Sequence, residues 1–306
     1  MSTSTPRSVT KDNEIIGDGG TIKPSPSNTQ RFIKRFAGNW HGMLGMGLIL
    51  ILALLCTLAQ FISHYDPLGQ NLSQALQAPS LQHLLGTDYL GRDILTRILY
   101  GGRVTLAISF LSVGLGLGIG LPLGAVSGYF GGWVDMVIQR VTDIMLSFPS
   151  FLLALMLVSI LGIGVKNLII SIGIMSIPSF SRIVRGYVLS LREMTFIEAS
   201  RSLGATNFPI LLNHIIPNVW VPVIVNASLN MGYAISTAAG LGFLGYGVPS
   251  PTPEWGMMLG EAQEYLFSHP FMVTYPGIVI FMAIVGFNLL GDGLRDAMDP
   301  YLRNIK

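Results

Sequence analysis

The sequence predicts an all-α membrane protein with six transmembrane helices. Half of its 306 residues are hydrophobic and only 11% are charged, whereas about 25% of the residues in an average soluble domain are charged. The mean hydropathy is +0.57. Apolar stretches recur along the chain, and a membrane-spanning helix needs about 20 mostly apolar residues. Together these observations exclude an ordinary soluble domain.

The first element is a polar tail. Residues 1–30 are rich in Ser, Thr, Pro and Gly, and such a segment cannot bury enough apolar surface to fold. We therefore expect residues 1–35 to form a disordered tail and residues 36–306 to form the transmembrane domain. The first apolar run begins too late and is too long for a removable signal peptide.

Six apolar segments follow the tail. They lie at about 42–64, 104–130, 138–163, 167–189, 218–246 and 272–292. Lys and Arg gather in the N-terminal tail, around the segment 195–217 and in the C-terminal tail, whereas the loop 247–271 has neither. Because cytoplasmic loops carry the excess of Lys and Arg, we expect both termini and the segment 195–217 to be cytoplasmic.

The segment TFIEASRSLGATNFPILLNHIIPN, residues 195–218, is built like a small soluble helical hairpin. Thr195 and Glu198 have the spacing of a capping box. Gly204 is placed where a helix ends in the left-handed conformation. Pro209 suits the first turn of a second helix, and Pro217 is expected to close that helix.

The composition of this hairpin favours insertion into a groove on a protein partner. Its small residues Ala199, Ser200 and Ala205 allow close approach. A lipid-bound helix would have a broad apolar face opposite many Lys or Arg residues, and this hairpin is poor in both. A purely structural hairpin remains the alternative, since Glu198 as a cap and Gly204 as a turn need no partner.

Two further patterns are candidates for packing and for contacts outside the membrane. Glycines every four residues are typical of close helix packing, within a bundle or between subunits; they are Gly116, Gly120, Gly124 and Gly128. On the predicted outer loops, Asp88, Arg92 and Asp93 form either a self-paired ion cluster or a contact for a docking protein. Trp255 is expected to be an interfacial anchor.

Known catalytic patterns are absent from the sequence. It has no phosphate-binding GxxxxGK[ST] loop, no HExxH motif or metal-ligand spacing of histidines, and no GxSxG turn. We therefore predict no enzymatic activity and no metal or cofactor bound by this chain. Asp143, near Arg140 on a helix, is interpreted as a local ion pair at the membrane surface rather than a coupling-ion site.

The hairpin resembles the cytoplasmic signature of ABC importer permeases, with Ser200 and His214 as mild departures. Four other segments resemble one subfamily, the oligopeptide/dipeptide/nickel importer permeases, and within it the second of two paired permeases. The likeness covers about residues 35–303. The segments are HLLGTDYLGRDILTRILYGGRVTLAIS (83–109), GYFGGWVD (128–135), FLGYGVPSPTPEWGMML (243–259) and FNLLGDGLRDAMDPYLR (287–303).

This resemblance implies a type I importer permease fold with a cytoplasmic coupling helix, in the plasma (inner) membrane. It implies as partners a second permease, two ABC ATPase subunits that bind ATP, an extracytoplasmic solute-binding protein and membrane lipid, with no nucleic acid. The residues implied to couple to the ATPase are Glu198, Ala199, Ser200, Gly204, Ala205 and Pro217.

Transport of di- or oligopeptides is the preferred function, on family frequency. The same machinery importing nickel or another small solute is one alternative. A secondary transporter that uses Asp143 and Arg140 as coupling groups is another, and a membrane scaffold without transport is a third.

Overall fold

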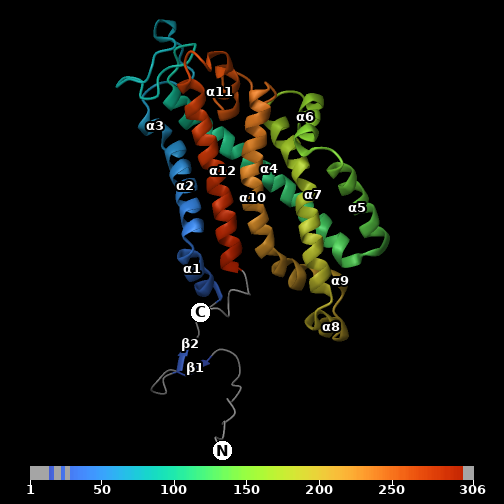
Figure 1. Ribbon diagram of the computed structural model, residues 1–306. Coiled ribbons are helices and arrows are strands. Elements are labelled where there is room, and N and C mark those ends of the chain that lie inside the picture. Colours follow the sequence, from blue (N-terminus) through green and yellow to red (C-terminus); the bar gives the residue numbers. More distant parts are fainter. Residues whose placement is uncertain (1–13, 17–21, 25–27, 299–306) are drawn as a thin grey trace, which may run out of the picture.

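The computed structural model describes residues 14–16, 22–24 and 28–298, and its long helices run side by side in a bundle (Figure 1). Five helical segments are long and apolar enough to cross a membrane, and the number is six if one bent pair of shorter helices is counted as a single span. This confirms the predicted all-α architecture. The single long helices are α2 (Trp40–Thr57), α4 (Ile94–Phe130), α7 (Val165–Arg192), α10 (Ile216–Phe243) and α12 (Phe271–Met298).

The third predicted span is broken rather than continuous. It consists of α5 (Gly132–Leu146) and α6 (Ser150–Leu161), which are bent by 89° relative to each other. Pro149 stands at the break as the N-cap of α6. Proline has no backbone N–H to continue the hydrogen-bond ladder of α5, so the chain turns here and starts a new helix.

The second span begins earlier than hydropathy predicts, at Ile94 rather than 104. Asp93 is its N-cap, and the Asp93 carboxylate accepts a hydrogen bond from the Thr96 N–H at 2.8 Å. A capping carboxylate satisfies an N–H that has no partner within the helix. A polar first turn therefore extends α4 beyond the apolar stretch.

The N-terminal part of the chain contains two short strands and one helix among the described residues. Strand β1 (Glu14–Ile16) pairs antiparallel with β2 (Ile22–Pro24), and helix α1 covers Asn28–Gly38. Most of the expected disordered tail, residues 1–35, lies outside the described residues. Its last residues are helical instead, since α1 begins within it.

The bundle is held most closely between α4 and α7, through the predicted glycine stripe. A Cβ added at Gly116 would lie 2.7 Å from Ser176 Cβ, and one added at Gly120 would lie 2.7 Å from Phe180 Cβ. Any side chain on this face would push the two helices apart. All four glycines of the stripe face α7: Gly116, Gly120, Gly124 and Gly128.

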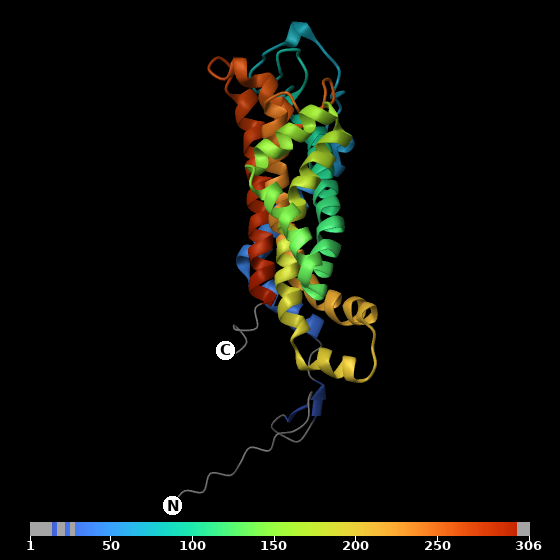
Figure 2. The same cartoon turned by 90° about the vertical axis from the view of Figure 1, so that its right-hand side faces the viewer.

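Short elements cover the two ends of the bundle. At the end shown at the top of Figure 1 lie α3 (Ala59–Ile62), η1 (Leu72–Gln74), α11 (Trp255–Ala262) and η3 (Gln263–Tyr265). At the opposite end a hairpin joins α7 to α10. It consists of α8 (Thr195–Ser202), α9 (Asn207–Ile210) and η2 (Leu211–Ile215), and it projects beyond the long helices (Figure 2).

Candidate functional site

The projecting hairpin is anchored to the bundle by apolar side chains on one face. Ile197 of α8 is fully buried, as are Ile210 and Ile215 on the returning segment. These residues pack in one cluster with Tyr129 at the end of α4 and Val188 of α7. The hairpin is therefore fixed to the ends of the two most closely packed helices.

The turn of the hairpin has the geometry predicted for a glycine. Gly204 has φ +86°, which confirms the left-handed conformation. The Gly204 N–H donates to the Arg201 carbonyl at 2.9 Å, and the Ala205 N–H donates to the Ser200 carbonyl at 3.1 Å. These two bonds make a Schellman motif, which satisfies the last carbonyls of α8.

The predicted capping box is not formed. Met194, not Thr195, is the N-cap of α8, and no side chain caps this helix. Thr195 is the first helical residue, so its hydroxyl is one position too late to reach the N–H groups of the first turn. Glu198 is exposed, and its carboxylate makes no side-chain hydrogen bond within the described part of the chain.

Pro217 does not end the second helix, contrary to the prediction. α9 runs through the π-helical turn η2 directly into α10, and Pro217 lies in the first turn of α10. Proline is tolerated there because the first N–H groups of a helix have no intrahelical partner. The Asn218 side-chain amide donates to the His214 carbonyl at 2.6 Å and supports this join.

The hairpin exposes apolar, small and charged side chains on its surface. Two of its apolar side chains are largely exposed, Leu203 at 88% and Phe208 at 66%. Arg201 stacks over the Tyr129 ring, 5.6 Å from its centroid. Of the residues predicted to couple, Ser200 is half-buried and the others are exposed: Glu198, Ala199, Gly204, Ala205 and Pro217. Small, apolar and acidic groups thus share one accessible surface.

At the other end of the bundle, the outer-loop residues form a buried ion cluster. Arg92 donates from Nε to Asp88 Oδ2 at 2.5 Å and from Nη2 to Glu261 Oε2 at 2.9 Å. Arg97 donates to the same Glu261 oxygen at 3.0 Å. Both guanidinium groups are buried. Because Asp88, Arg92 and Arg97 are covered, the geometry favours the self-paired cluster over direct contact with a docking protein.

Asp93 serves α4 rather than the ion cluster. One of its oxygens caps the helix at Thr96, and the other lies 2.9 Å from His83 Nδ1. Sequence reasoning did not place Glu261 in this cluster, because it lies 169 residues from Arg92, and Arg97 joins the cluster through that same Glu261 carboxylate. The sequence contains no local signal for such a pairing.

Trp255 is not an interfacial anchor, because its side chain is fully buried. Its indole Nε1 donates to the Ile98 carbonyl of α4 at 2.9 Å. The preceding residue, Glu254, caps α11 and also accepts from the Thr105 hydroxyl at 2.9 Å. Burial raises the pKa of Glu254, and its hydrogen bonds act in the opposite direction. Glu254 and Trp255 together fasten the outer helix α11 to α4.

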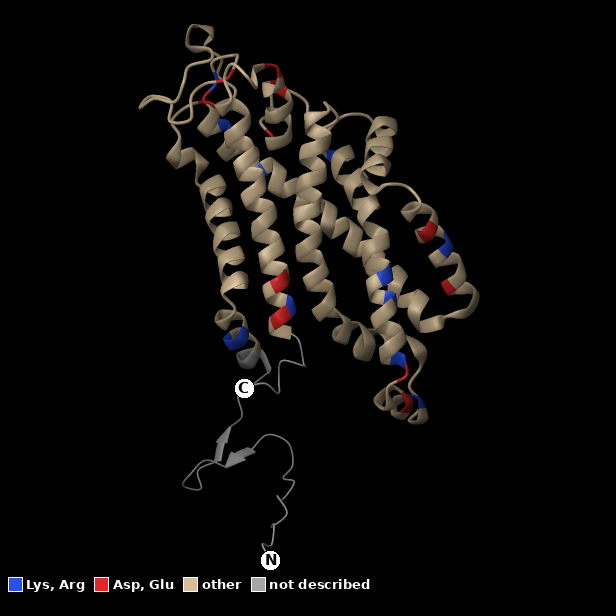
Figure 3. Ribbon diagram, viewed as in Figure 1, with Lys and Arg blue, Asp and Glu red and all other residues tan. Residues whose placement is uncertain are grey.

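Asp143 forms an ion pair, but its partner is not Arg140. Asp143 Oδ1 lies 2.6 Å from Arg182 Nη2, and both side chains are about half exposed. Arg182 belongs to α7. Asp135 of α5 accepts two hydrogen bonds at 2.6 Å from Arg185, which also belongs to α7. These two ion pairs connect α5 to α7. Most other charged residues lie towards the two ends of the bundle (Figure 3).

The described residues contain no group of three or more His, Cys, Asp or Glu side chains placed to hold a metal ion. The geometry thus offers an anchored, exposed hairpin at one end and a covered ion cluster at the other.

Comparisons with known proteins place these features in a family. Residues 120–304 match the model of the binding-protein-dependent transport system inner membrane component. Residues 27–79 match the model of the N-terminal transmembrane domain of oligopeptide transport permease C. The chain is 44% identical over 271 residues to a dipeptide transport system permease protein from Alkalihalophilus pseudofirmus, covering 89% of each chain.

Two other relatives extend this comparison. A glutathione transport system permease protein from Pectobacterium atrosepticum is 41% identical over 292 residues, covering 95% of each chain. Among solved structures, an inward-facing MetNI methionine ABC transporter aligns with a TM-score of 0.54 at 22% identity. That alignment covers 66% of this chain and 97% of the other, and it shows a common fold.

Proposed function

Because the chain belongs to the family of binding-protein-dependent transport system inner membrane components, we propose that it is a permease subunit of an ATP-driven ABC importer for peptides. The observation that carries the proposal is the hairpin α8–α9, which is anchored by Ile197 but leaves its small and acidic residues exposed. Peptides are the preferred cargo because relatives over 40% identical are named for dipeptide and glutathione transport.

In this proposal the chain pairs with a second permease, and the pathway lies between them. Two ATPase subunits dock on the hairpins and hydrolyse ATP, so both termini are cytoplasmic. A solute-binding protein delivers cargo at the opposite end, near α11. A nucleotide-dependent change in the ATPases drives the permeases between inward and outward states only if the hairpins bind the two ATPase states with different free energies.

The test is a single substitution that leaves the hairpin intact. Glu198→Ala removes an exposed carboxylate with no side-chain hydrogen bond within the described residues, so the variant breaks no side-chain hydrogen bond of α8. We expect the variant to reach the membrane normally but to retain less ATPase on purification and to import dipeptide more slowly. Gly204→Asp, which also strains the turn, is expected to do so more severely.

The matched control is Glu264→Ala, which removes an exposed carboxylate at the opposite end of the bundle. It should retain the ATPase subunits in full. Wild-type ATPase retention and uptake in both hairpin variants would refute the coupling role. Uptake abolished by an ionophore while cellular ATP stays intact would instead support an ion-coupled transporter.

A further inference from the structure

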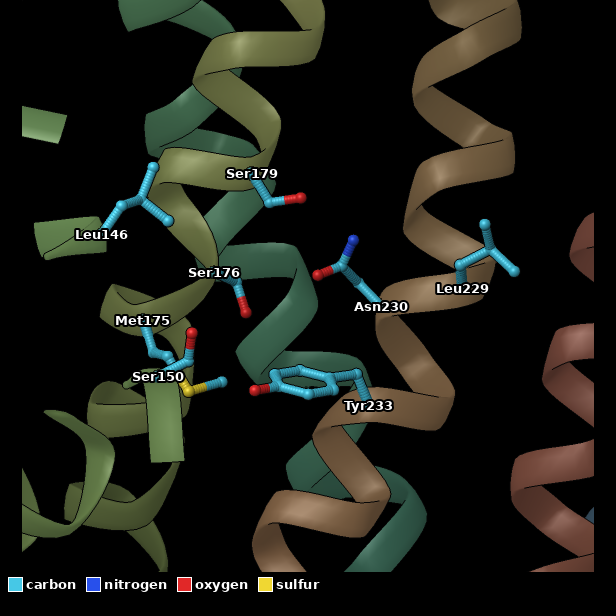
Figure 4. A pocket seen from close by; sticks show the side chains of 8 residues that line it. All are labelled: Leu146, Ser150, Met175, Ser176, Ser179, Leu229, Asn230 and Tyr233. Carbon is cyan, nitrogen blue, oxygen red and sulfur yellow. The ribbon is translucent and has the colours of Figure 1, made fainter. Parts of the chain in front are cut away.

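Polar side chains from α7 and α10 line a partly open cavity of about 300 Å³ between these two helices (Figure 4). The eight lining residues come from the α5–α6 break, α7 and α10, and they are Leu146, Ser150, Met175, Ser176, Ser179, Leu229, Asn230 and Tyr233. In Figure 4 the Asn230 amide points from α10 towards Ser176 and Ser179, and the Tyr233 ring points towards Ser150 and Met175. The polar groups therefore converge on one space.

The spacing of these residues gives each helix a polar face. Ser176 and Ser179 lie three residues apart on α7, while Asn226, Asn230 and Tyr233 are separated by four and three residues on α10. Residues three and four apart lie on the same face of a helix. The Asn226 side-chain amide donates to Ser179 Oγ at 3.4 Å, so the two faces meet.

Exposing hydroxyl and amide side chains of a membrane helix to lipid costs free energy. The Tyr233 side chain is 47% exposed, and its hydroxyl has no hydrogen-bond partner among the residues that the structure describes. Burying a hydroxyl or amide in hydrocarbon without a partner is unfavourable, and intramembrane polar residues generally face a cavity or another helix. This face of α7 and α10 is thus suited to water, a ligand or a protein neighbour.

The chemistry of the lining selects among ligands. None of the eight lining residues is Asp, Glu, Lys, Arg or His. Serine, asparagine and tyrosine side chains donate and accept hydrogen bonds without charge, as the amide groups of a peptide backbone do. Met175 and Leu146 add apolar surface that accepts varied side chains. The volume is at the lower end of ligand pockets, about 300–1,000 Å³, which suits a short stretch of chain.

A second cavity continues from the first towards the end that carries the hairpin. Its volume is about 730 Å³, and Leu229 lines both cavities. Asn226 lines the second cavity and is bonded to Ser179 in the first. Asn218, Tyr187 and Arg295 add polar groups towards the hairpin end. The two cavities therefore adjoin between the middle of the bundle and that end, and in the second one these polar groups lie among apolar residues.

We propose that Ser179, Asn230 and Tyr233 form a transient binding site for the backbone amide groups of a peptide during its passage. This rests on the proposed function as a peptide importer. The site binds amide groups common to all peptides rather than particular side chains or charged termini, so a single site serves peptides of varied sequence. Selection among peptides is left to the binding protein.

The first test compares dipeptide import by the complete importer in cells, with variants that remove only polar atoms. Tyr233→Phe deletes one hydroxyl, and Asn230→Leu replaces an amide by an apolar group of similar size. We expect the double variant to import dipeptide about tenfold more slowly, equivalent to about 1.4 kcal/mol, at an unchanged amount of assembled complex. The matched control is Tyr246→Phe together with Ser190→Ala, at positions that do not line the cavity, and it should import at the wild-type rate.

The second test detects the ligand directly. In a Cys56→Ala background, Asn230→Cys places one thiol in the cavity of the complex reconstituted in vesicles. We expect it to react with N-ethylmaleimide, and to react at least fivefold more slowly while dipeptide, binding protein and ATP are present. Ser190→Cys, exposed on α7 outside the cavity, should not respond to dipeptide.

The outcomes distinguish a failure of the proposed peptide-import function from a failure of the proposed binding site in the cavity. No dipeptide import by the wild-type importer overturns the proposed function and, with it, the peptide assignment of the cavity. Wild-type import together with wild-type behaviour of the double variant overturns the site alone. A thiol at 230 that reacts equally fast with and without dipeptide also overturns it. A thiol that never reacts shows that the cavity is closed to small molecules in the assembled complex, which again overturns the site.

Discussion

The turn at Gly204 permits a perturbation whose energetic cost is confined to the backbone. Its φ of +86° lies in the left-handed region, and a Cβ added there meets no atom within 4 Å. A non-glycine residue in this conformation costs about 1–2 kcal/mol. Gly204→Ala therefore destabilises the hairpin by that amount without a steric clash. Gly204→Asn costs less, because asparagine tolerates this conformation, and Gly204→Val costs most.

The assay is hydrogen exchange of the hairpin amides in the solubilised complex without nucleotide. A loss of 1–2 kcal/mol changes an opening equilibrium by about 5- to 30-fold, so the Gly204 and Ala205 region should exchange faster by that factor in Gly204→Ala. The order of exchange rates should be Gly, Asn, Ala, Val from slowest to fastest. Gly186→Ala on α7, where an added Cβ also meets nothing within 4 Å, is the control and should not speed exchange. Equal exchange in all four residues at 204 would refute the argument.

Two other predictions concern the bundle and the outer end. Gly120→Val, which places atoms within 2.7 Å of Phe180 Cβ, should lower the thermal stability of the solubilised protein by several degrees, whereas Gly118→Val, with open space around it, should have little effect. Burial raises the pKa of Glu254 in the folded protein, so the protonated carboxyl stabilises the fold. This stabilisation is complete below about pH 4, the ordinary pKa of a glutamate, and it is lost as the pH rises through the raised pKa of the folded state. The free energy of unfolding should therefore fall less for Glu254→Gln than for the wild type between acidic and neutral pH. Denaturation measured at a series of pH values would contradict this if the free energies of unfolding of the two proteins changed in parallel with pH.

Hydropathy predicted the spans because the bilayer imposes a length and an apolar composition on any helix that crosses it. It did not predict where a span breaks. Pro149 and Pro178 both interrupt apolar segments, yet the chain breaks at the first and α7 continues through the second. Pro178 is buried, and its helix α7 packs closely against α4; neighbouring helices can hold a proline-containing helix in place. That difference depends on tertiary packing, which a local pattern does not contain.

The hairpin was predicted in outline because caps and turns are local chemistry. Gly204 was placed correctly, since only a few residue types adopt its conformation. Thr195 was predicted to be the N-cap of α8 but is its first helical residue. Pro217 was predicted to end a helix but lies in the first turn of α10, where proline is also common. The outer ion cluster joins Arg92 to Glu261 across 169 residues, and only the fold brings these two side chains together.

One helix connects the features described above. Through η2, the hairpin segment continues into α10 without a loop. Midway along, α10 carries Asn230 and Tyr233 into the polar cavity. Near its far end, Gly242 lies so close to Glu254 that an added Cβ would be 2.8 Å from the carboxylate. Pro222 lies in α10 between the hairpin and the cavity, and a proline inside a helix lacks one backbone hydrogen bond and permits a bend. A displacement of the hairpin would therefore reach the cavity and the outer helix α11 only as far as α10 moves as one body across Pro222.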